Sequence, residues 1–457
     1  MGRTRVIFGG VVAHCIGVAA GEFQLLTETA IGIDESGKIV FVESLAADAA
    51  EAARKYGLDS AELITLKHTD VLIPGLVDTH THAPQWENRG IGMDLPLLKW
   101  IDKYTRPTEM TFASTNKADR VYDMVVRDTL RNGTTTVCYY GTIHLESTKV
   151  LADKCFKYGQ RGFIGQPSMD KSGYKEYCNH SPEDAVQRTK ELIKYIRTFD
   201  PEVSVVTPIV TPGFAPVLSA ESMRQLAQLA AAEDLPMQTH LSENTEEIQE
   251  MHRLFPSSPS YTHTLDVNGV LTSRTVLGHC VHLSDEERLL IAARGSGVSH
   301  CPSSNLNLSS GECRVRQLLD AGIKVGLGCD CSGGHSASVL ENLRRASDVS
   351  RTLVATEGPR AQLEIHELLY LATLGGADVC GIADRVGSFE VGKEFDAILI
   401  NPLAGLATGA GSIRLKEVET PMDIFQKVLF CCDDRHIRKV FVKGRVCVDK
   451  EAEAKQD

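Results

Sequence analysis

Eight short apolar runs, separated by amphipathic stretches, fill the middle of the chain and constrain its fold most strongly. Runs rich in Val and Ile are typical of strands buried on both faces of a parallel sheet. Amphipathic stretches such as 117–131 and 220–234 supply the helices between them. The pattern predicts an α/β fold, a (β/α)8 TIM barrel over residues 71–385. Its strands are expected in the runs 71–82, 134–140, 162–168, 203–210, 235–243, 275–282, 297–305 and 324–330.

The two ends of the chain fall outside this repeat. Residues 1–70 and 386–450 contain short segments that alternate apolar and polar residues, as antiparallel strands do. We therefore expect both ends to combine into one small β-sandwich domain beside the barrel. The apolar N-terminal stretch resembles a signal peptide, but His14 interrupts it and its Val/Ile alternation fits a strand better.

Charge and cysteine usage narrow the class of protein. The formal net charge of -12 argues against a nucleic-acid partner, because affinity for phosphates needs a basic surface. No uninterrupted apolar stretch reaches the roughly 18 residues of a membrane span. The 13 cysteines include no CxxC pair, which favours free thiols in a reducing compartment. These features predict a soluble, cytoplasmic protein.

Metal-competent side chains stand at the ends of several predicted strands. In a barrel of this kind, chemistry takes place at the C-terminal ends of the strands. His80 and His82 end the first run, and their spacing of two turns both side chains to one side of the strand. A lone buried histidine is more often a core residue, but a core does not require five polar groups at strand ends. The remaining three of these five strand-end residues are His240, His279 and Asp330.

This set of side chains predicts a single metal ion per chain. Three histidines and one carboxylate suit Zn²⁺ and also permit Fe²⁺ or Mn²⁺. We expect the ligands to be His80, His82, His240 and Asp330.

Three residues are candidates for catalytic roles. Asp330 is expected to hold the attacking water and to help deprotonate it. Glu243, three residues after His240, is the candidate proton shuttle, although an acid at the start of a helix is its alternative reading. His279 is expected to hydrogen-bond the water and the substrate, or to be a more distant ligand.

The motifs at these strand ends resemble those of the amidohydrolase superfamily. They read PGLVDTHTH, HLSEN, GH and GLGCD, and the resemblance covers nearly the whole chain. The fourth run, TPIVTPGF, offers no lysine at its end, so the resemblance implies the one-metal deaminase branch and not the branch with two metals and a bridging lysine. The family resemblance also implies a homodimer.

Longer stretches are similar to guanine deaminases. They are HAPQWENRGIGMDLPLLKWIDKY, RNGTTTVCYYGTIH, HCPSSNLNLSSG, LATLGGAD and GSFEVGKEFDAILINP. The resemblance implies that Gln85 binds a purine and that Phe214 packs against its ring. Trp86, next to Gln85, would also suit a planar base. His279 would contact the substrate as well.

One position departs from the guanine deaminase pattern. Gly213 stands where these enzymes usually carry a substrate-contacting Arg, and glycine supplies no side-chain donor. Arg89 or Arg106, both in the long segment after the first run, are candidates to replace it. Gly213 is otherwise a plain turn residue, or a sign of a pocket reshaped for a larger heterocycle.

The leading hypothesis is a zinc-dependent aminohydrolase that acts on cyclic amidines and converts guanine and water into xanthine and ammonia. The nearest alternative is deamination of a pterin or another aminopurine, which the glycine at position 213 leaves open. A cyclic-amide hydrolase and an inactive scaffold are more distant alternatives. The missing bridging lysine argues against the first, and the complete set of strand-end residues argues against the second.

Overall fold

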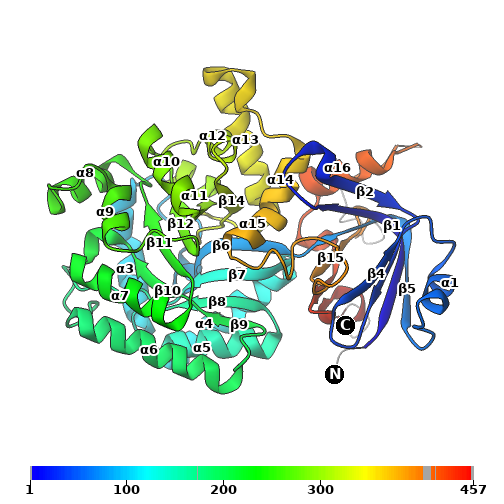
Figure 1. Ribbon diagram of the computed structural model, residues 1–457, viewed down its shortest axis with the longest axis horizontal. Coiled ribbons are helices and arrows are strands. Elements are labelled where there is room, and N and C mark those ends of the chain that lie inside the picture. Colours follow the sequence, from blue (N-terminus) through cyan, green and yellow to red (C-terminus); the bar gives the residue numbers. More distant parts are fainter. Residues whose placement is uncertain (1–2, 172, 405–412, 417, 454–457) are drawn as a thin grey trace.

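The computed structural model describes residues 3–171, 173–404, 413–416 and 418–453. Its central part contains two parallel sheets, as the apolar runs predict. One sheet has the order β6-β7-β8-β9 and the other the order β10-β11-β12-β13-β14 (Figure 1). Their strands are β6 (Leu76–His82), β7 (Thr134–Tyr140), β8 (Arg161–Gly165), β9 (Val206–Pro208), β10 (Val210–Gly213), β11 (Met237–Leu241), β12 (Thr275–His279), β13 (Gly297–His300) and β14 (Lys324–Leu327).

The two parallel sheets adjoin at both ends of their strand order. Only Ile209 separates β9 from β10, and its backbone N–H donates to the carbonyl of Ile164 on β8 at 3.1 Å. At the other end, the N–H of Asp330, beyond β14, donates to the carbonyl of His80 on β6 at 2.8 Å. The residues after β14 are thereby fixed beside the end of β6.

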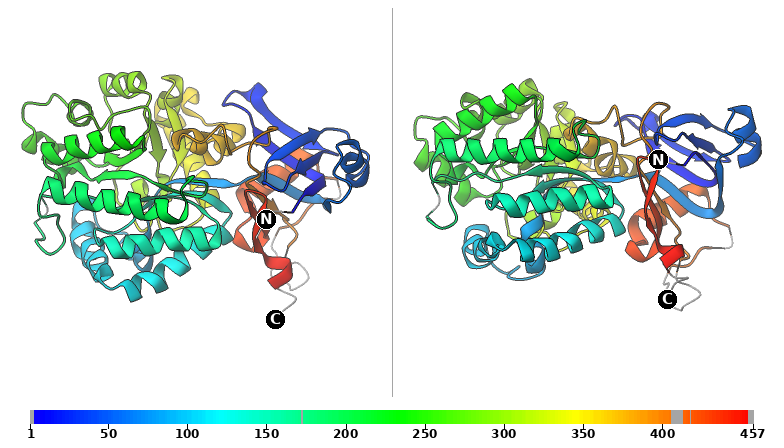
Figure 2. Two further views of the ribbon diagram at one scale, coloured as in Figure 1. Left: turned by 60° about the horizontal axis from the view of Figure 1, so that its bottom comes forward. Right: turned by 90° about the horizontal axis from the view of Figure 1, so that it is seen from below.

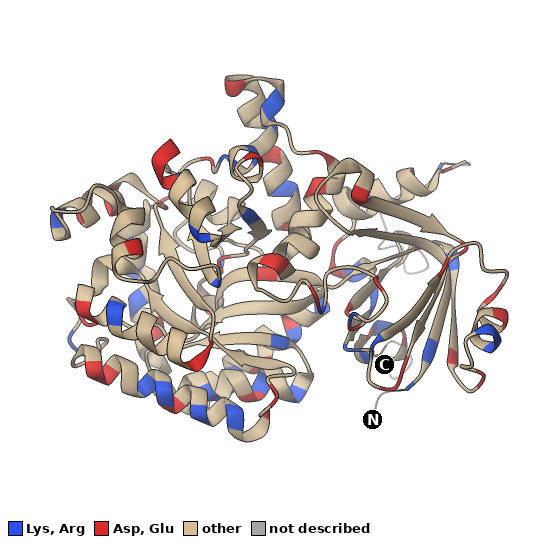
Figure 3. Ribbon diagram, in the orientation of Figure 1, with Lys and Arg blue, Asp and Glu red and all other residues tan. Residues whose placement is uncertain are grey.

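Amphipathic helices cover these sheets. In α4, buried residues recur at helical spacing, among them Val121, Val125 and Leu130, so that one face of the helix packs on the core. Lys and Arg are interspersed with Asp and Glu along α6 (Figure 3). The longer helices of this part are α4 (Thr115–Arg131), α5 (Leu145–Tyr158), α6 (Pro182–Phe199), α7 (Ala220–Glu233), α8 (Thr245–Leu254), α9 (Tyr261–Val267), α10 (Asp285–Arg294), α13 (Val339–Glu357) and α14 (Ile365–Ala372).

Shorter helices complete the connections. They are α2 (Leu97–Trp100), α3 (Arg106–Met110), α11 (Pro302–Asn307), α12 (Val315–Asp320) and α15 (Leu374–Val379), and α11 comes directly after β13. Within the part of the chain that the structure describes, no helix is both long enough and apolar enough to cross a lipid bilayer.

A third, mixed sheet takes strands from both ends of the chain (Figure 2). Its order is β17-β16-β15-β5-β1-β3-β4, and β2 pairs with β1. The strands are β1 (Arg5–Cys15), β2 (Phe23–Thr27), β3 (Ala30–Ile33), β4 (Ile39–Glu43), β5 (Glu62–Pro74), β15 (Ala397–Ile400), β16 (Ile437–Val442) and β17 (Arg445–Asp449). Helices α1 (Ala49–Lys55), α16 (Pro421–Cys431) and α17 (Lys450–Glu453) accompany it.

The passage from the mixed sheet to the first parallel strand differs from the sequence expectation. The run 71–82 is not one strand, because β5 continues to Pro74 and pairs there with β15. The expected domain boundary at residue 70 therefore falls inside β5. The chain changes sheets at Gly75, where a Cβ would lie 2.1 Å from the Thr135 hydroxyl oxygen, so only glycine fits this close approach.

A buried ion group connects the mixed sheet to the parallel strands. Arg161, the first residue of β8, donates from Nε to Asp396 at 2.7 Å and also contacts Glu394. Both acids lie just before β15, and Arg161 is only 3% exposed. Burial alone would raise the pKa of Glu394, but the attraction of Arg161 and Arg385 outweighs burial and holds this pKa below its ordinary value.

Replacing Arg161 by Met is expected to lower the free energy of unfolding by about 3–5 kcal/mol, because two buried carboxylates lose their main partner. Denaturant titration measures the loss. The control is Arg197→Met, whose pair with Glu233 is 39% and 34% exposed and whose removal should cost less than about 1 kcal/mol. Equal small losses in both variants would contradict the structural role of Arg161.

Candidate metal centre and substrate cavity

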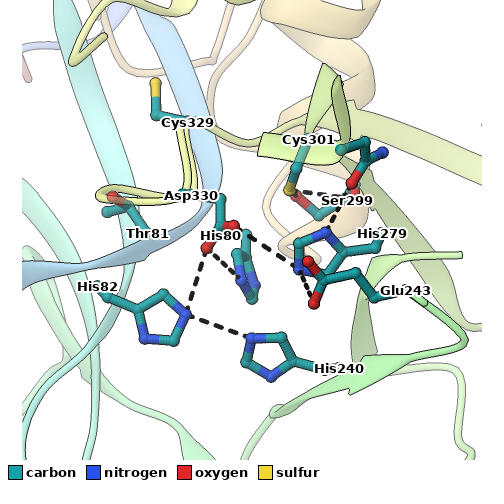
Figure 4. A network of polar contacts seen from close by, with 12 residues as sticks. His80, Thr81, His82, His240, Glu243, His279, Ser299, Cys301, Cys329 and Asp330 are labelled. Carbon is teal, nitrogen blue, oxygen red and sulfur yellow. Dashed lines mark hydrogen bonds and ion pairs between the residues drawn. The ribbon is translucent and has the colours of Figure 1, made fainter. Parts of the chain in front are cut away.

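The polar residues expected at strand ends converge on one point (Figure 4). His80 is on β6, His240 on β11 and His279 on β12, and Asp330 follows β14. One potential ligand atom from each of these four residues lies within 4.8 Å of the others. Four separate elements therefore bring a metal-binding set together, as the rule of strand C-termini predicts.

His82 belongs to the same cluster. Its Nε2 lies 3.3 Å from Asp330 Oδ1 and 3.3 Å from His240 Nε2. The Nε2 atom of His80 lies 3.2 Å from the same Asp330 oxygen. All five residues singled out in the sequence are thus neighbours, and the geometry leaves both His82 and His279 as candidates for the fourth ligand position.

Two hydrogen bonds from outside the cluster orient the histidines. Nδ1 of His240 lies 2.9 Å from the carbonyl oxygen of Gly213, and Nδ1 of His279 lies 2.9 Å from Oδ1 of Asn305. An Nδ1–H that donates to oxygen leaves Nε2 with a lone pair directed at the cluster. Such contacts fix the tautomer and the ring plane of a metal ligand.

Electrostatics set these groups in the protonation states that bind a cation. Burial lowers the pKa of His80 to about 4, and burial together with the neighbouring histidines places the pKa of His240 well below its ordinary value. Burial would raise the pKa of Asp330, but contacts with His80 and His82 outweigh it and hold this pKa well below its usual range. Neutral imidazoles and an ionised carboxylate are the ligand forms of these groups.

Glu243 lies beside the cluster and not within it. Its Oε2 lies 3.4 Å from Nε2 of His279, and the residue is 2% exposed. Its Oε1 is buried and, among the described residues, has no hydrogen-bond partner. Burial and the nearby charge of Asp330 raise the pKa of Glu243 well above its ordinary value. An unsatisfied buried oxygen next to three imidazoles and a carboxylate fits a site built for a divalent cation and a polar ligand.

Non-glycine residues at these strand ends adopt left-handed backbone conformations. The φ angle is 69° at His279, 43° at Asp330 and 49° at Ser242. Such conformations cost of order 1–3 kcal/mol each and cluster at functional sites. At this site they turn the chain at the point where the side chain must face the cluster.

A cavity opens over the cluster, and most of the expected substrate-contacting residues line it. Gln85, Gly213, Phe214 and Glu243 all contribute to its wall. The ring centroid of Phe214 lies 5.8 Å from that of His240, with the rings nearly perpendicular. Gln85 and Phe214 are the positions that the resemblance to guanine deaminases implies, whereas His279, also expected to contact the substrate, is not among the residues that line the cavity.

The aromatic residue expected beside Gln85 lies elsewhere. Trp86 is 5% exposed, packs in the main core and carries the Arg89 guanidinium 3.8 Å above its ring. Neither residue is among those that line the cavity. Trp100, in the same long segment, does line it, and so does Arg106. The DLPLLKW stretch contains Trp100, but the sequence did not indicate which of the two tryptophans lines the cavity.

Gly213 has a conformational reason to be glycine. Its φ angle is +62°, which glycine adopts without the steric cost of a Cβ. A Cβ built there would approach no atom closer than 3.6 Å, so the cavity wall has room for a side chain at this position. Gly213 acts through its carbonyl, which accepts from Thr239 Oγ1 at 3.0 Å and contacts His240.

The family model for the amidohydrolase family matches residues 71–447. The chain belongs to the amidohydrolase family. The match includes every residue of the cluster described above.

Relatives of this amidohydrolase extend the likeness to nearly the full chain. The probable guanine deaminase of Schizosaccharomyces pombe is 42% identical over 456 residues, spanning 99% of this chain and 85% of the relative. The guanine deaminase of Mus musculus is 40% identical, spanning 97% of this chain and 96% of the relative. A crystal structure of guanine deaminase from C. acetobutylicum with bound guanine in the active site has a TM-score of 0.86 and 31% identity. It covers 97% of this chain and 99% of that chain.

Removing a ligand histidine should release the metal. We expect the purified His240→Ala variant to retain less than a tenth of the metal of the unaltered protein, because losing even a residue that only hydrogen-bonds a metal ligand typically costs about 10–100-fold in affinity. His300→Ala is the matched control, since His300 ends the neighbouring strand β13 but is outside the cluster. Elemental analysis measures both, and His82→Ala beside His279→Ala identifies the fourth ligand. Full metal content in His240→Ala would refute the centre.

Proposed function

We propose that this amidohydrolase is a guanine deaminase that hydrolyses guanine to xanthine and ammonia. The observation that carries the proposal is one cavity lined by His82, His240 and Asp330 of the metal-binding cluster together with Glu243 and Gln85. Relatives named as guanine deaminases align over almost the whole chain, and they support the same substrate.

The proposed architecture explains why the site lies at the C-terminal ends of the parallel strands. We propose that the two parallel sheets act as one closed (β/α)8 barrel, with residues 71–385 as the catalytic domain. Residues 1–70 and 386–450 would form the small β-sandwich domain, to which the end of β5 up to Pro74 also contributes. The links from Asp330 to His80 and from Ile209 to Ile164 support closure. All strand C-termini then open on the same face, where amidohydrolase chemistry occurs.

The proposed cofactor is one Zn²⁺ per chain, for which Fe²⁺ or Mn²⁺ could substitute. His80, His82, His240 and Asp330 would hold it. Three nitrogens and one carboxylate oxygen suit Zn²⁺, which prefers four ligands of this kind. When bound, such a cation supplies the Lewis acidity that makes water a nucleophile at neutral pH.

Protein groups would carry the proton transfers. Asp330 would hold the attacking water by hydrogen bonding and orient it toward the amidine carbon. Glu243 would transfer two protons in turn. The first would go from the attacking water to a ring nitrogen as the C–O bond forms, and the second, released from the same oxygen with the help of Asp330, would go to the amino group as the C–N bond breaks and ammonia leaves. His279, fixed by Asn305, would donate to or orient the water and the substrate from the other side.

Base binding would use the cavity wall. Gln85 would hydrogen-bond the purine, and Phe214 would pack against it. Because Trp100 lines the cavity and Trp86 packs in the core, we assign the second aromatic contact to Trp100. Gly213 would contribute shape and its carbonyl. Arg106 is the candidate for the missing charged contact, because it lines the cavity and Arg89 stacks on Trp86 instead.

The alternatives receive less support. The relatives that span the chain are named as guanine deaminases, so a pterin or another aminopurine is not favoured. A cyclic-amide hydrolase and an inactive scaffold are equally unsupported by these names. We also propose a cytoplasmic homodimer, on the soluble composition and the family resemblance.

A substrate panel tests the proposed function. The metal-loaded protein should release ammonia from guanine with a kcat/KM at least about tenfold above that for pterin, isoxanthopterin or adenine. Coupled ammonia detection and the absorbance of xanthine give two independent readouts. A pterin turned over faster than guanine would overturn the assignment, and absence of ammonia from every compound would overturn deamination itself.

The variant Glu243→Gln tests the proton-transfer role. We expect it to keep its metal and its fold but to lose about 10²-fold or more in kcat, because the amide can neither accept nor deliver the proton. Glu246→Gln is the control, since Glu246 is exposed in the same segment. Near-normal turnover of guanine by Glu243→Gln would eliminate the shuttle role.

A further inference from the structure

A buried carboxylate lines the cavity on the side of α3. Glu109 is 7% exposed and lies between the cavity and the core, in a helix of five residues. None of the metal-binding residues contacts it through a hydrogen bond or an ion pair that the structure records. Burying a carboxylate costs free energy unless hydrogen-bond donors satisfy it, so the donors around Glu109 indicate its role.

Each oxygen of Glu109 accepts one hydrogen bond from a different buried side chain. Nε2 of Gln85 donates to Oε1 at 2.8 Å, and the hydroxyl of Tyr177 donates to Oε2 at 2.7 Å. Burial and then the charge of Glu109 raise the pKa of Tyr177, which keeps its hydroxyl protonated as a donor. Gln85 and Tyr177 both line the cavity as well.

The other end of the Gln85 amide is also fixed. The backbone N–H of Ser332 donates to Gln85 Oε1 at 3.1 Å. A backbone N–H can only donate, and an ionised carboxylate can only accept. A flipped amide would set Nε2 against the N–H of Ser332 and Oε1 against the carboxylate of Glu109, and both contacts would be repulsive. Only one amide orientation satisfies both neighbours.

This orientation determines what Gln85 offers to a ligand. One N–H of Nε2 is used by Glu109, and the second remains for a group in the cavity. A ligand that lacks an acceptor there would leave a buried donor unpaired, and sites of this kind reject such ligands strongly.

We propose that Glu109 is a positioning residue for substrate selection, which holds the Gln85 amide so that it presents an N–H donor to an acceptor atom of the substrate ring. The proposal rests on the proposed function for the identity of that ring. Glu109 acts through Gln85, and the Tyr177 hydroxyl satisfies the second oxygen of the carboxylate by donating a hydrogen bond to it.

The test compares guanine with three analogues. 2-Aminopurine lacks O6 and has an acceptor in place of the donor at N1, 7-deazaguanine lacks N7, and 3-deazaguanine lacks N3 and with it the reacting amidine, so it is compared as an inhibitor through its Ki. In the unaltered enzyme, one analogue should lose about tenfold or more, in kcat/KM or in 1/Ki, through the Gln85 contact. Glu109→Met removes both acceptor oxygens at similar volume. It should reduce the discrimination against that analogue about tenfold, and Gln85→Leu should do so for the same analogue.

Two variants separate positioning from a merely structural role. Glu109→Gln can still accept from Gln85 and should restore most of the discrimination. Tyr177→Phe leaves the contact between Glu109 and Gln85 in place and should preserve it. If Glu109→Met weakened turnover of guanine, 2-aminopurine and 7-deazaguanine and inhibition by 3-deazaguanine by one common factor, selection through Gln85 would be refuted.

A crystallographic readout decides the positioning without reference to any substrate. In unliganded crystals, Gln85 should adopt one rotamer in the unaltered protein and in Tyr177→Phe, and it should shift or split in Glu109→Met. An unchanged Gln85 in Glu109→Met would overturn the proposal. A shifted Gln85 in a protein that releases no ammonia from guanine would refute the proposed substrate and retain the positioning role.

Discussion

The rest of the site depends on the contacts between the buried, negatively charged carboxylate of Asp330 and the imidazole rings around it. Burial disfavours an ionised carboxylate, and the contacts with His80 and His82, together with nearby His279, reverse that preference. Those contacts require β6 to lie beside the segment after β14, and the N–H of Asp330 bonded to the carbonyl of His80 fixes that neighbourhood. A register shift of one residue would turn the histidines of β6 to the opposite face and leave the charge unpaired.

The parallel sheets supply the rigidity that such a cluster needs. Left-handed conformations at His279 and Asp330 are unfavourable for residues with a Cβ, and an isolated loop would relax out of them. Strands β12 and β14 are buried and paired, so their ends hold these conformations in place. The contacts of Gly213 and Asn305 with the histidine rings then remove the remaining rotational freedom.

The sequence predicted the parallel strands and the convergence of their polar ends because both follow from short-range patterns. Strand period and the geometry of parallel strands place His80, His240 and Asp330 without knowledge of distant contacts. The choice of Trp100 over Trp86 as a cavity residue was not predictable, because it depends on how the helical segment after β6 folds back on the core. Glu109 gave no sequence signal, since one acid in a short helix is normally solvated.

The residues that could be predicted and those that could not lie in different parts of the chain. The groups proposed for chemistry stand on strand ends, where the sheets fix them. Four groups proposed for recognition, Gln85, Trp100, Arg106 and Glu109, come from the one connection between β6 and α4, whereas Phe214 follows β10. That connection is not part of the sheets, but the hydrogen bond from the Ser332 N–H to Gln85, beyond the end of β14, fixes it beside the strand ends. Because Gly213 on β10 supplies no side chain, recognition depends more heavily on this connection, and changes there would alter the substrate without disturbing the cation site.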